Sequence, residues 1–135
     1  MTYFLDTNIL IYLIKNRPPE VAERLNDLPM EDEVGMSFVT YAELLQGAER
    51  STRRTSVHER LRALTRQVPV RYPTGPAICQ AYAEEYTRLK AAGTPIGAND
   101  LWIACHALSE GAVVVTNNTR EFRRIPELMV EDWAS

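Results

Sequence analysis

The chain has 135 residues, of which 45% are hydrophobic and 24% charged, and its net charge is −3. This length is typical of one compact domain, and we expect a single domain over residues 1–135. No apolar run approaches the roughly 18 residues of a membrane span, and no basic segment precedes an apolar stretch at the start, so we expect a soluble, cytoplasmic protein rather than a membrane or secreted one.

Short apolar runs alternate with stretches of helical periodicity along the whole chain. Strands are predicted where apolar residues run together, at 3–5, 34–37, 68–70, 112–115 and 129–130. Helices are predicted where apolar residues recur every three or four positions, at 7–15, 19–28, 40–48, 51–65, 76–91, 99–109 and 120–122. This alternation predicts an α/β fold, a three-layer α/β/α sandwich in which about seven helices flank a short parallel sheet of four or five strands.

Single residues mark several of the predicted boundaries. Pro19 suits the first position of a helix, and Gly111 suits the residue that ends one. Thr40 is predicted as an N-cap, with Glu43 three residues later as the partner of a capping box. Pro69 places its strand at an edge of the sheet, because proline donates no backbone hydrogen bond.

The cysteines and histidines suggest no metal site of their own. Cys79 and Cys105 are the only cysteines, and in a cytosolic chain both are expected as buried, reduced thiols. No Cys and His spacing resembles a zinc site. His106 is expected in the core or on the surface, pointing away from Asp100, and His58 is expected to be exposed.

Charge is distributed unevenly along the chain. Of the 15 basic residues 13 are arginine, and residues 50–71 contain seven arginines and one acid, whereas residues 20–33 contain six acids and one base. The planar guanidinium group suits phosphate better than the lysine ammonium does. Arg50, Arg53 and Arg54 are therefore candidate contacts to an RNA backbone. A solvated helix face, or a contact with another protein, explains the same stretch.

Three acids, Asp6, Glu43 and Asp100, each lie at a predicted helix start. Capping alone explains each one. Together they are more informative, because ligands of parallel α/β sheets bind beyond the carboxyl ends of the strands. Gathered carboxylates repel one another unless a cation neutralises them, and Mg²⁺ prefers oxygen ligands. Since such an ion activates water and stabilises charge on phosphoryl oxygens, the three acids predict a metal-dependent nuclease.

Several polar residues are expected to line the same site. Thr116, Asn117 and Asn118 follow a predicted strand, and Glu121 comes soon after. Thr116 offers a hydroxyl to the site or caps the strand end. Asn8 either orients a carboxylate or forms an Asx turn. Three aromatic residues could stack on an unpaired base, although core packing is the stronger alternative: Phe38, Tyr41 and Trp102.

Four segments together resemble the signatures of PIN-domain nucleases: residues 5–8 (LDTN), 40–44 (TYAEL), 99–104 (NDLWIA) and 115–118 (VTNN). Their order and spacing fit over essentially the whole chain. Residues 93–97 (GTPIG), together with 116–122, 125–126 (IP) and 131–133 (EDW), further resemble the VapC toxins of VapBC toxin–antitoxin pairs, in the subgroup that cuts the anticodon loop of initiator tRNA.

The resemblance implies a toxin that inhibits translation as an endoribonuclease dependent on Mg²⁺ or Mn²⁺. Asp6 and Asp100 would be the chief metal ligands, and Glu43 matches the third acid of the family. The resemblance also implies a homodimer that joins a VapB-type antitoxin in a higher assembly. The antitoxin's tail would block the site, and the complex would bind operator DNA through the antitoxin.

The chain departs from the family at Asn118, where many relatives carry a fourth acid. Its carbonyl could orient a metal-bound water, and Glu121 is the nearest replacement carboxylate. We therefore expect one tightly held ion, and a second only when substrate phosphate contributes oxygens. The alternative function is a catalytically silent PIN-fold module that binds RNA or regulates, favoured by Asn118 and the negative net charge. A phosphatase function is a weaker alternative, because aspartyl-phosphate enzymes carry a second Asp two residues after the first, and here that residue is Asn8.

Overall fold

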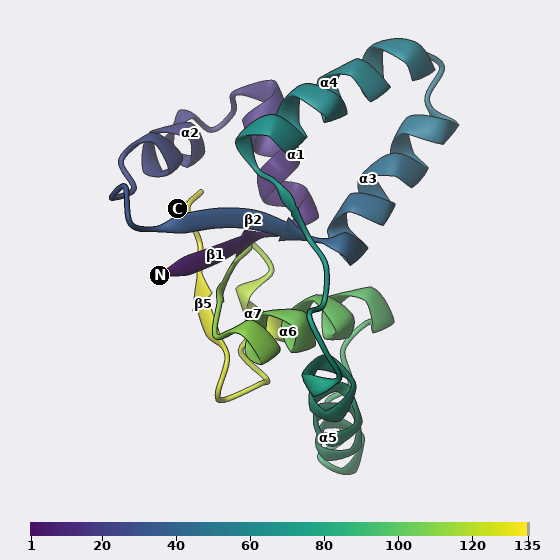
Figure 1. The fold of residues 1–135 in the computed structure, drawn as a ribbon. Helices are drawn as coiled ribbons and strands as arrows, with labels where there is room; N and C mark the ends of the chain where they lie inside the picture. Colours follow the sequence, from purple (N-terminus) through teal and green to yellow (C-terminus); the bar gives the residue numbers. More distant parts are fainter. Residues whose placement is uncertain (135) are drawn as a thin grey trace.

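The computed structural model describes residues 1–134 and contains twelve regular elements (Figure 1). The strands are β1 (Thr2–Leu5), β2 (Glu33–Ser37), β3 (Val70–Arg71), β4 (Val113–Val115) and β5 (Met129–Glu131). The helices are α1 (Thr7–Lys15), α2 (Pro19–Asn26), α3 (Phe38–Arg50), α4 (Arg54–Gln67), α5 (Ala77–Ala91), α6 (Ala98–Glu110) and α7 (Thr119–Phe122).

The strands form one parallel sheet in the order β3-β2-β1-β4-β5, as the alternation of strands and helices predicts. The edge position of β3 agrees with the signal from Pro69. The chain first builds outward from β1 to β2 and β3, and then continues on the other side of β1 with β4 and β5. The order therefore reverses between β1 and β4, and such a switch point leaves a crevice beyond the carboxyl ends of both strands.

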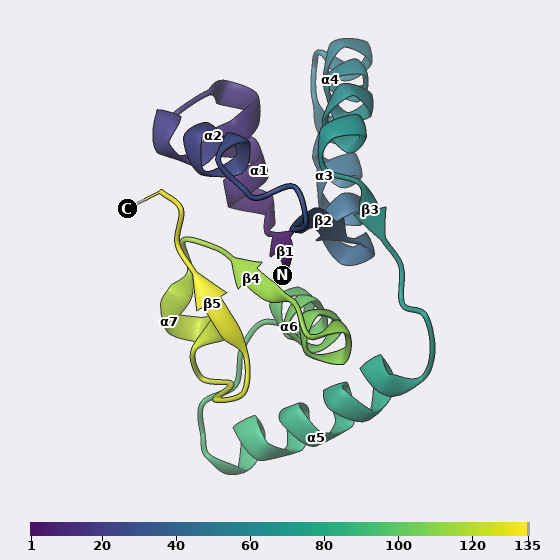
Figure 2. The ribbon, with the colours of Figure 1, turned by 60° about the vertical axis from the view of Figure 1, so that its left-hand side comes forward.

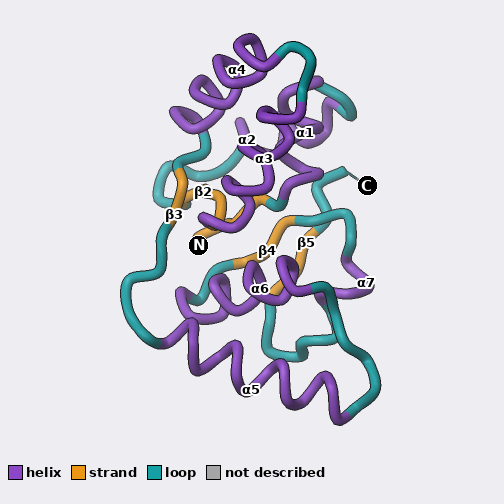
Figure 3. Tube along the Cα trace, turned by 90° about the vertical axis from the view of Figure 1, so that its right-hand side faces the viewer, coloured by secondary structure: helices purple, strands orange, loops and turns teal. Residues whose placement is uncertain are grey.

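Helices cover both faces of the sheet, which gives the predicted three layers (Figure 2). One core cluster packs α5, α6 and α7 against the sheet, and the other packs α1, α2, α3 and α4 against the opposite face. In Figure 3 these two groups of helices lie on opposite sides of the strands. Phe4 belongs to the first cluster and Leu5 to the second, because successive side chains of a strand point to opposite faces.

The structure corrects the predicted start of α3. This helix begins at Phe38, and the hydroxyl of Ser37 caps it by accepting a hydrogen bond from the backbone N–H of Val39 at 3.3 Å. The capping box predicted from Thr40 does not form, because Ser37, the last residue of β2, already caps the helix three residues earlier. Thr40 lies inside the helix, where its buried hydroxyl has no hydrogen-bond partner within residues 1–134. The carboxylate of Glu43 is thus not used in capping.

Smaller differences concern exposure and one helix terminus. Cys105 is buried as expected, but the prediction is wrong for Cys79, which lies on the exposed side of α5. His58 is only partly exposed, because its Nε2 lies 2.7 Å from a carboxylate oxygen of Glu49. α6 begins one residue before Asn99, so Asp100 lies in its first turn. No helix within residues 1–134 is long and apolar enough to cross a membrane.

Candidate active site

Asp6 and Thr116 lie at the switch point of the sheet. Asp6 follows β1, and its backbone N–H donates to the carbonyl of Val115 in β4 at 3.0 Å. Its Oδ1 caps α1 by accepting from the N–H of Ile9 at 3.2 Å, and its Oδ2 accepts from the hydroxyl of Thr116. The Asp6 side chain is thus fixed at both oxygens and buried. Asp6 thus caps α1, and its carboxylate also lies at the predicted site, so capping does not exclude a role there.

Glu43 connects three helices. Oε1 of Glu43 accepts a hydrogen bond from the hydroxyl of Thr7 in α1 at 2.8 Å, and Oε2 accepts from the side-chain amide of Asn99 in α6 at 3.3 Å. Sequence reasoning missed both donors as site residues. A signal was present, because Thr7 follows Asp6 directly and Asn99 precedes Asp100 directly.

Asp100 and Glu121 share one hydrogen-bond donor. The amide nitrogen of Asn118 lies 3.4 Å from Oδ2 of Asp100 and 2.5 Å from Oε2 of Glu121. Asn118 therefore lies between two carboxylates and offers both of them a neutral hydrogen-bond donor. The contacts to Asp100 and Glu121 are made by its amide nitrogen and not by its side-chain carbonyl.

Asn8 and Asn117 form the rim of the site on the side of α1. The amide of Asn8 donates to the side-chain oxygen of Asn117 at 3.3 Å, and the amide of Asn117 donates to the hydroxyl of Tyr12 at 2.8 Å. Asn8 thus contacts an amide rather than a carboxylate through its side chain. Its position supports a role in lining the site more than one in orienting an acid.

The acids of the site influence one another electrostatically. The pKa of Asp100 is raised from 3.8 to about 6, first by burial and then by the negative charges of Asp6, Glu121 and Glu43. Burial also raises the pKa of Asp6, while the hydrogen bonds from Thr116 and Ile9 oppose this rise. The structure therefore brings residues 6, 43, 100 and 121 within electrostatic range, although they come from distant parts of the sequence.

The oxygen atoms of these side chains are the type of ligand that a hard divalent cation prefers. Within residues 1–134, no three His, Cys, Asp or Glu side chains lie close enough together to form a preassembled metal cluster. Hydroxyl and amide groups separate the acids instead. Mg²⁺ retains several waters and needs only one or two protein carboxylates, so a loose group of oxygen donors suits it better than a close cage would.

The remaining candidates lie outside this group of acids. Arg50, Arg53 and Arg54 are exposed around the junction of α3 and α4, where Arg54 forms an ion pair with Glu49 at 2.9 Å. The three candidate stacking residues are partly buried and pack against the two core clusters, which favours their structural interpretation: Phe38, Tyr41 and Trp102.

Comparison with known proteins places the chain in a family. The family model described as "PIN domain" matches residues 3–128. "Ribonuclease VapC1" of Haemophilus influenzae (strain R2866) is 50% identical over 133 residues, which cover 98% of each chain. "tRNA(fMet)-specific endonuclease VapC" of Salmonella typhimurium is 40% identical over 136 residues, again covering 98% of each chain.

A solved structure gives the same relationship in three dimensions. The structure of VapBC-1 from nontypeable Haemophilus influenzae contains a chain that is 50% identical, with a TM-score of 0.94 and full coverage of both chains. The five-stranded parallel sheet and seven helices agree with this match. The chain therefore belongs to the PIN-domain family and, within it, to the VapC ribonucleases.

Proposed function

We propose that the chain is a Mg²⁺-dependent endoribonuclease toxin whose metal-binding and catalytic acids are Asp6, Glu43 and Asp100. The observation that carries this proposal is the convergence of three acids from distant segments at the switch point of the sheet, where burial and mutual repulsion raise the pKa of Asp6 and Asp100. Buried carboxylates that repel one another are costly in the absence of a cation. Perturbed pKa values of this kind are concentrated at functional sites.

Each acid has a distinct environment that suits a distinct part in the reaction. Asp6, fixed by the backbone of α1 and by Thr116, and Asp100, beside Asn118, would hold the ion. Glu43, oriented by Thr7 and Asn99, is the third acid. A divalent cation at such carboxylates supplies a water of lowered pKa and stabilises the charge that develops on phosphoryl oxygens.

One ion is proposed for the RNA-free protein. Asn118 presents its amide nitrogen to both Asp100 and Glu121, so the fourth acidic position is filled by a neutral hydrogen-bond donor. A second ion would then depend on oxygens from the substrate phosphate. Mn²⁺ has the same preference for carboxylate oxygens and is expected to replace Mg²⁺.

The proposed substrate is tRNA, with cleavage in the anticodon loop of initiator tRNA and inhibition of translation as the result. The 40% identity to a protein named tRNA(fMet)-specific endonuclease supports this choice. Exposed arginines at the junction of α3 and α4 are proposed to contact the RNA backbone, since guanidinium groups pair with phosphate. A VapB-type antitoxin is the proposed partner, supported by the similarity to VapBC-1, and a homodimer is the proposed toxin assembly.

The test is cleavage of defined RNAs by the antitoxin-free protein. Initiator and elongator tRNAs are incubated with protein in Mg²⁺, in Mn²⁺ and in EDTA, and the 5′ ends of the products are sequenced. We expect a single cut in the anticodon loop of initiator tRNA, lost in EDTA. Equal cleavage of both tRNAs would refute the proposed specificity for initiator tRNA but would still support the proposed nuclease activity. No cleavage by folded protein that binds Mg²⁺ would favour the silent RNA-binding module, which the amide of Asn118 in place of an acid makes the second candidate.

A further inference from the structure

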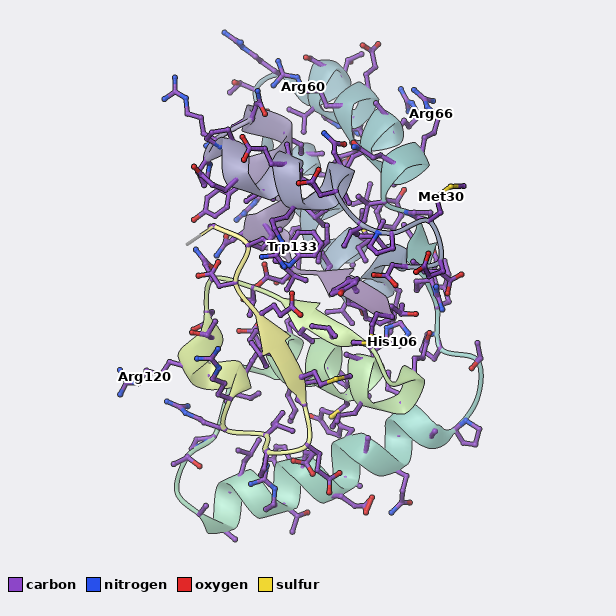
Figure 4. The ribbon with its side chains drawn as sticks, turned by 90° about the vertical axis from the view of Figure 1, so that its left-hand side faces the viewer. Met30, Arg60, Arg66, His106, Arg120 and Trp133 are labelled. Atoms are coloured by element: carbon purple, nitrogen blue, oxygen red, sulfur yellow. The ribbon has the colours of Figure 1, made fainter. Side chains whose placement is uncertain are left out.

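A fully buried histidine lies where α6, which carries Asp100, packs against the junction of β2 and α3, the helix that carries Glu43. The side chain of His106 in α6 has no exposed surface. Its Nδ1 lies 2.9 Å from the hydroxyl of Ser37, and its Nε2 lies 2.7 Å from a carboxylate oxygen of Glu110. Figure 4 shows His106 inside the molecule, between α6 and the sheet.

The hydrogen bonds of His106 determine its tautomer. A carboxylate only accepts, so Nε2 carries the hydrogen and donates to Glu110. Nδ1 then accepts from the hydroxyl of Ser37, whose oxygen accepts in turn from the N–H of Val39. Burial lowers the pKa of His106, while the neighbouring carboxylate of Glu110 opposes this shift. Arg71 balances the charge of Glu110 through an ion pair at 3.0 Å.

The surroundings of His106 restrict its movement. The rings of Phe4 and Phe38 contact the imidazole edge-on, with centroid distances of 4.9 Å and 5.6 Å. Both ring nitrogens therefore have hydrogen-bond partners, and two aromatic rings pack against the imidazole. A neutral, doubly hydrogen-bonded imidazole of this kind acts as a rigid connector between the elements that it joins.

His106 forms one of two polar contacts that fix α3 against α6. Ser37 at the start of α3 meets His106, and Glu43 meets Asn99 in the first turn of α6. Glu43 lies six positions after Ser37, and His106 lies seven positions after Asn99, which correspond to about 9 Å and about 10 Å of helix. Because these spans match, the two contacts hold the helices side by side at two points.

We propose that His106 is a positioning residue that holds Glu43 and Asp100 at the separation the reaction requires. This inference rests on the proposed function, in which both acids belong to the catalytic site. His106 contacts neither acid and acts through Ser37 and the frame of the two helices. If His106 only filled space in the core, an apolar side chain of similar size would serve equally well. Such a role would not need the hydrogen bond to Ser37 at the start of α3.

Two substitutions separate the link to Ser37 from the link to Glu110. His106→Asn keeps a side-chain oxygen near the position of Nδ1, so it can still accept from Ser37. His106→Gln keeps a donor near the position of Nε2, so it retains Glu110 and loses Ser37. The matched control is Ser109→Ala against Ser37→Ala, since the hydroxyl of Ser109 donates only to the backbone carbonyl of His106 at 2.8 Å within α6.

The experiment measures kcat and KM for RNA together with Mn²⁺ binding by calorimetry, after circular dichroism has shown which variants are folded. We expect His106→Gln and Ser37→Ala to lower kcat and to weaken Mn²⁺ binding, each by about tenfold or more, as loss of a group that orients metal ligands does. The KM for RNA should change by less than twofold. Ser109→Ala should match the wild type, and His106→Asn should recover part of the lost activity.

A double variant provides the decisive comparison. If Ser37 and His106 act through one hydrogen bond, the double variant Ser37→Ala/His106→Gln should be no less active than the less active of the two single variants. Full additivity, or unchanged kcat and Mn²⁺ binding in folded His106→Gln, would overturn the inference. If His106→Gln does not fold, Ser37→Ala and His106→Asn decide in the same way. Wild-type protein that neither binds Mn²⁺ nor cuts RNA would instead refute the proposed function.

Discussion

The hydroxyl of Thr116 donates a hydrogen bond to Oδ2 of Asp6 and so joins the ends of β4 and β1 across 110 positions of sequence. This bond stabilises the charged form of Asp6 and opposes the effect of burial on its pKa. Thr116→Val keeps the shape of the side chain but removes the donor. We expect the acid limb of kcat/KM for RNA cleavage to move to higher pH, by about one unit for a bond to a charged group.

The control for this prediction is Thr116→Ser, which retains the hydroxyl. Its pH–rate profile should follow that of the wild type, with at most a uniform loss of rate. An acid limb at the same pH in Thr116→Val and in the wild type would show that the hydroxyl does not set the protonation of Asp6.

We expect the charge of Asp100 to make the metal-free protein less stable at neutral pH than at acidic pH. Its pKa is 3.8 in a model peptide and about 6 in the folded protein. Between these pH values the folded protein binds a proton that the unfolded chain does not, so the free energy of unfolding falls as pH rises to about 6 and stays low above it. The shift corresponds to about 3 kcal/mol, which solvent screening at this half-buried carboxyl reduces to about 1 kcal/mol.

Asp100→Asn removes this charge. Without divalent ions, we expect the variant to melt about 3 °C above the wild type at pH 7 and at nearly the same temperature at pH 4. Thermal denaturation followed by circular dichroism measures both values. Asp27→Asn, which alters an exposed carboxylate in the short turn after α2, should leave the melting temperature within about 1 °C. A variant of Asp100 that melts lower at pH 7 would contradict the electrostatic account.

The amide of Asn118 is predicted to limit the number of bound ions. Asn118→Asp replaces the donor between Asp100 and Glu121 with a further carboxylate. We expect the number of Mn²⁺ ions per chain to rise from one to two, and the metal-free protein to lose stability because three acids then adjoin one another. Calorimetry and anomalous scattering from Mn²⁺-soaked crystals count the ions. Two full sites in the wild type without RNA would refute this prediction.

Most of the fold and the main acids could be predicted from sequence because they follow local rules. The continuous β-branched run of β4 and the acid after β1 are signals within a few residues. The start of α3 was not predictable in the same way. Ser37 and Thr40 are both good caps, and only the end of β2 decides between them. The prediction of Thr40 and the assignment of Glu43 to a capping box were wrong for this reason.

Contacts between distant segments account for the rest. The donors to Glu43 come from Thr7 and Asn99, and the partner of His106 is Ser37, 69 positions away. Periodicity identifies which face of a helix is buried, but it does not identify which polar residue that face meets. Exposure of Cys79 follows from the position of α5 at the outside of the molecule, which the helix pattern alone does not specify.

The exposed arginines near the start of α4 make a prediction about RNA affinity. Within residues 1–134, Arg54 is paired with Glu49, whereas neither Arg50 nor Arg53 takes part in an ion pair. Arg53→Ala should therefore weaken tRNA binding and reduce the slope of log affinity against log salt by about one. Fluorescence anisotropy with labelled tRNA at several salt concentrations measures this slope.

The control is Arg66→Ala, because Arg66 lies near the other end of α4 and points into solvent, as Figure 4 shows. It should leave the slope unchanged. Equal effects of the two substitutions would show that the arginines act only through net charge. No change in either would assign Arg53 to the solvated face of the helix.

The most direct test compares metal binding and RNA cleavage in the wild type, Asp6→Asn and Asp100→Asn. Calorimetric titration with Mg²⁺ and cleavage of initiator tRNA are measured on the same folded samples. The account predicts that the wild type binds Mg²⁺ and cuts the tRNA, and that each variant loses both properties while keeping its circular dichroism spectrum. Undiminished Mg²⁺-dependent cleavage by both variants would contradict it.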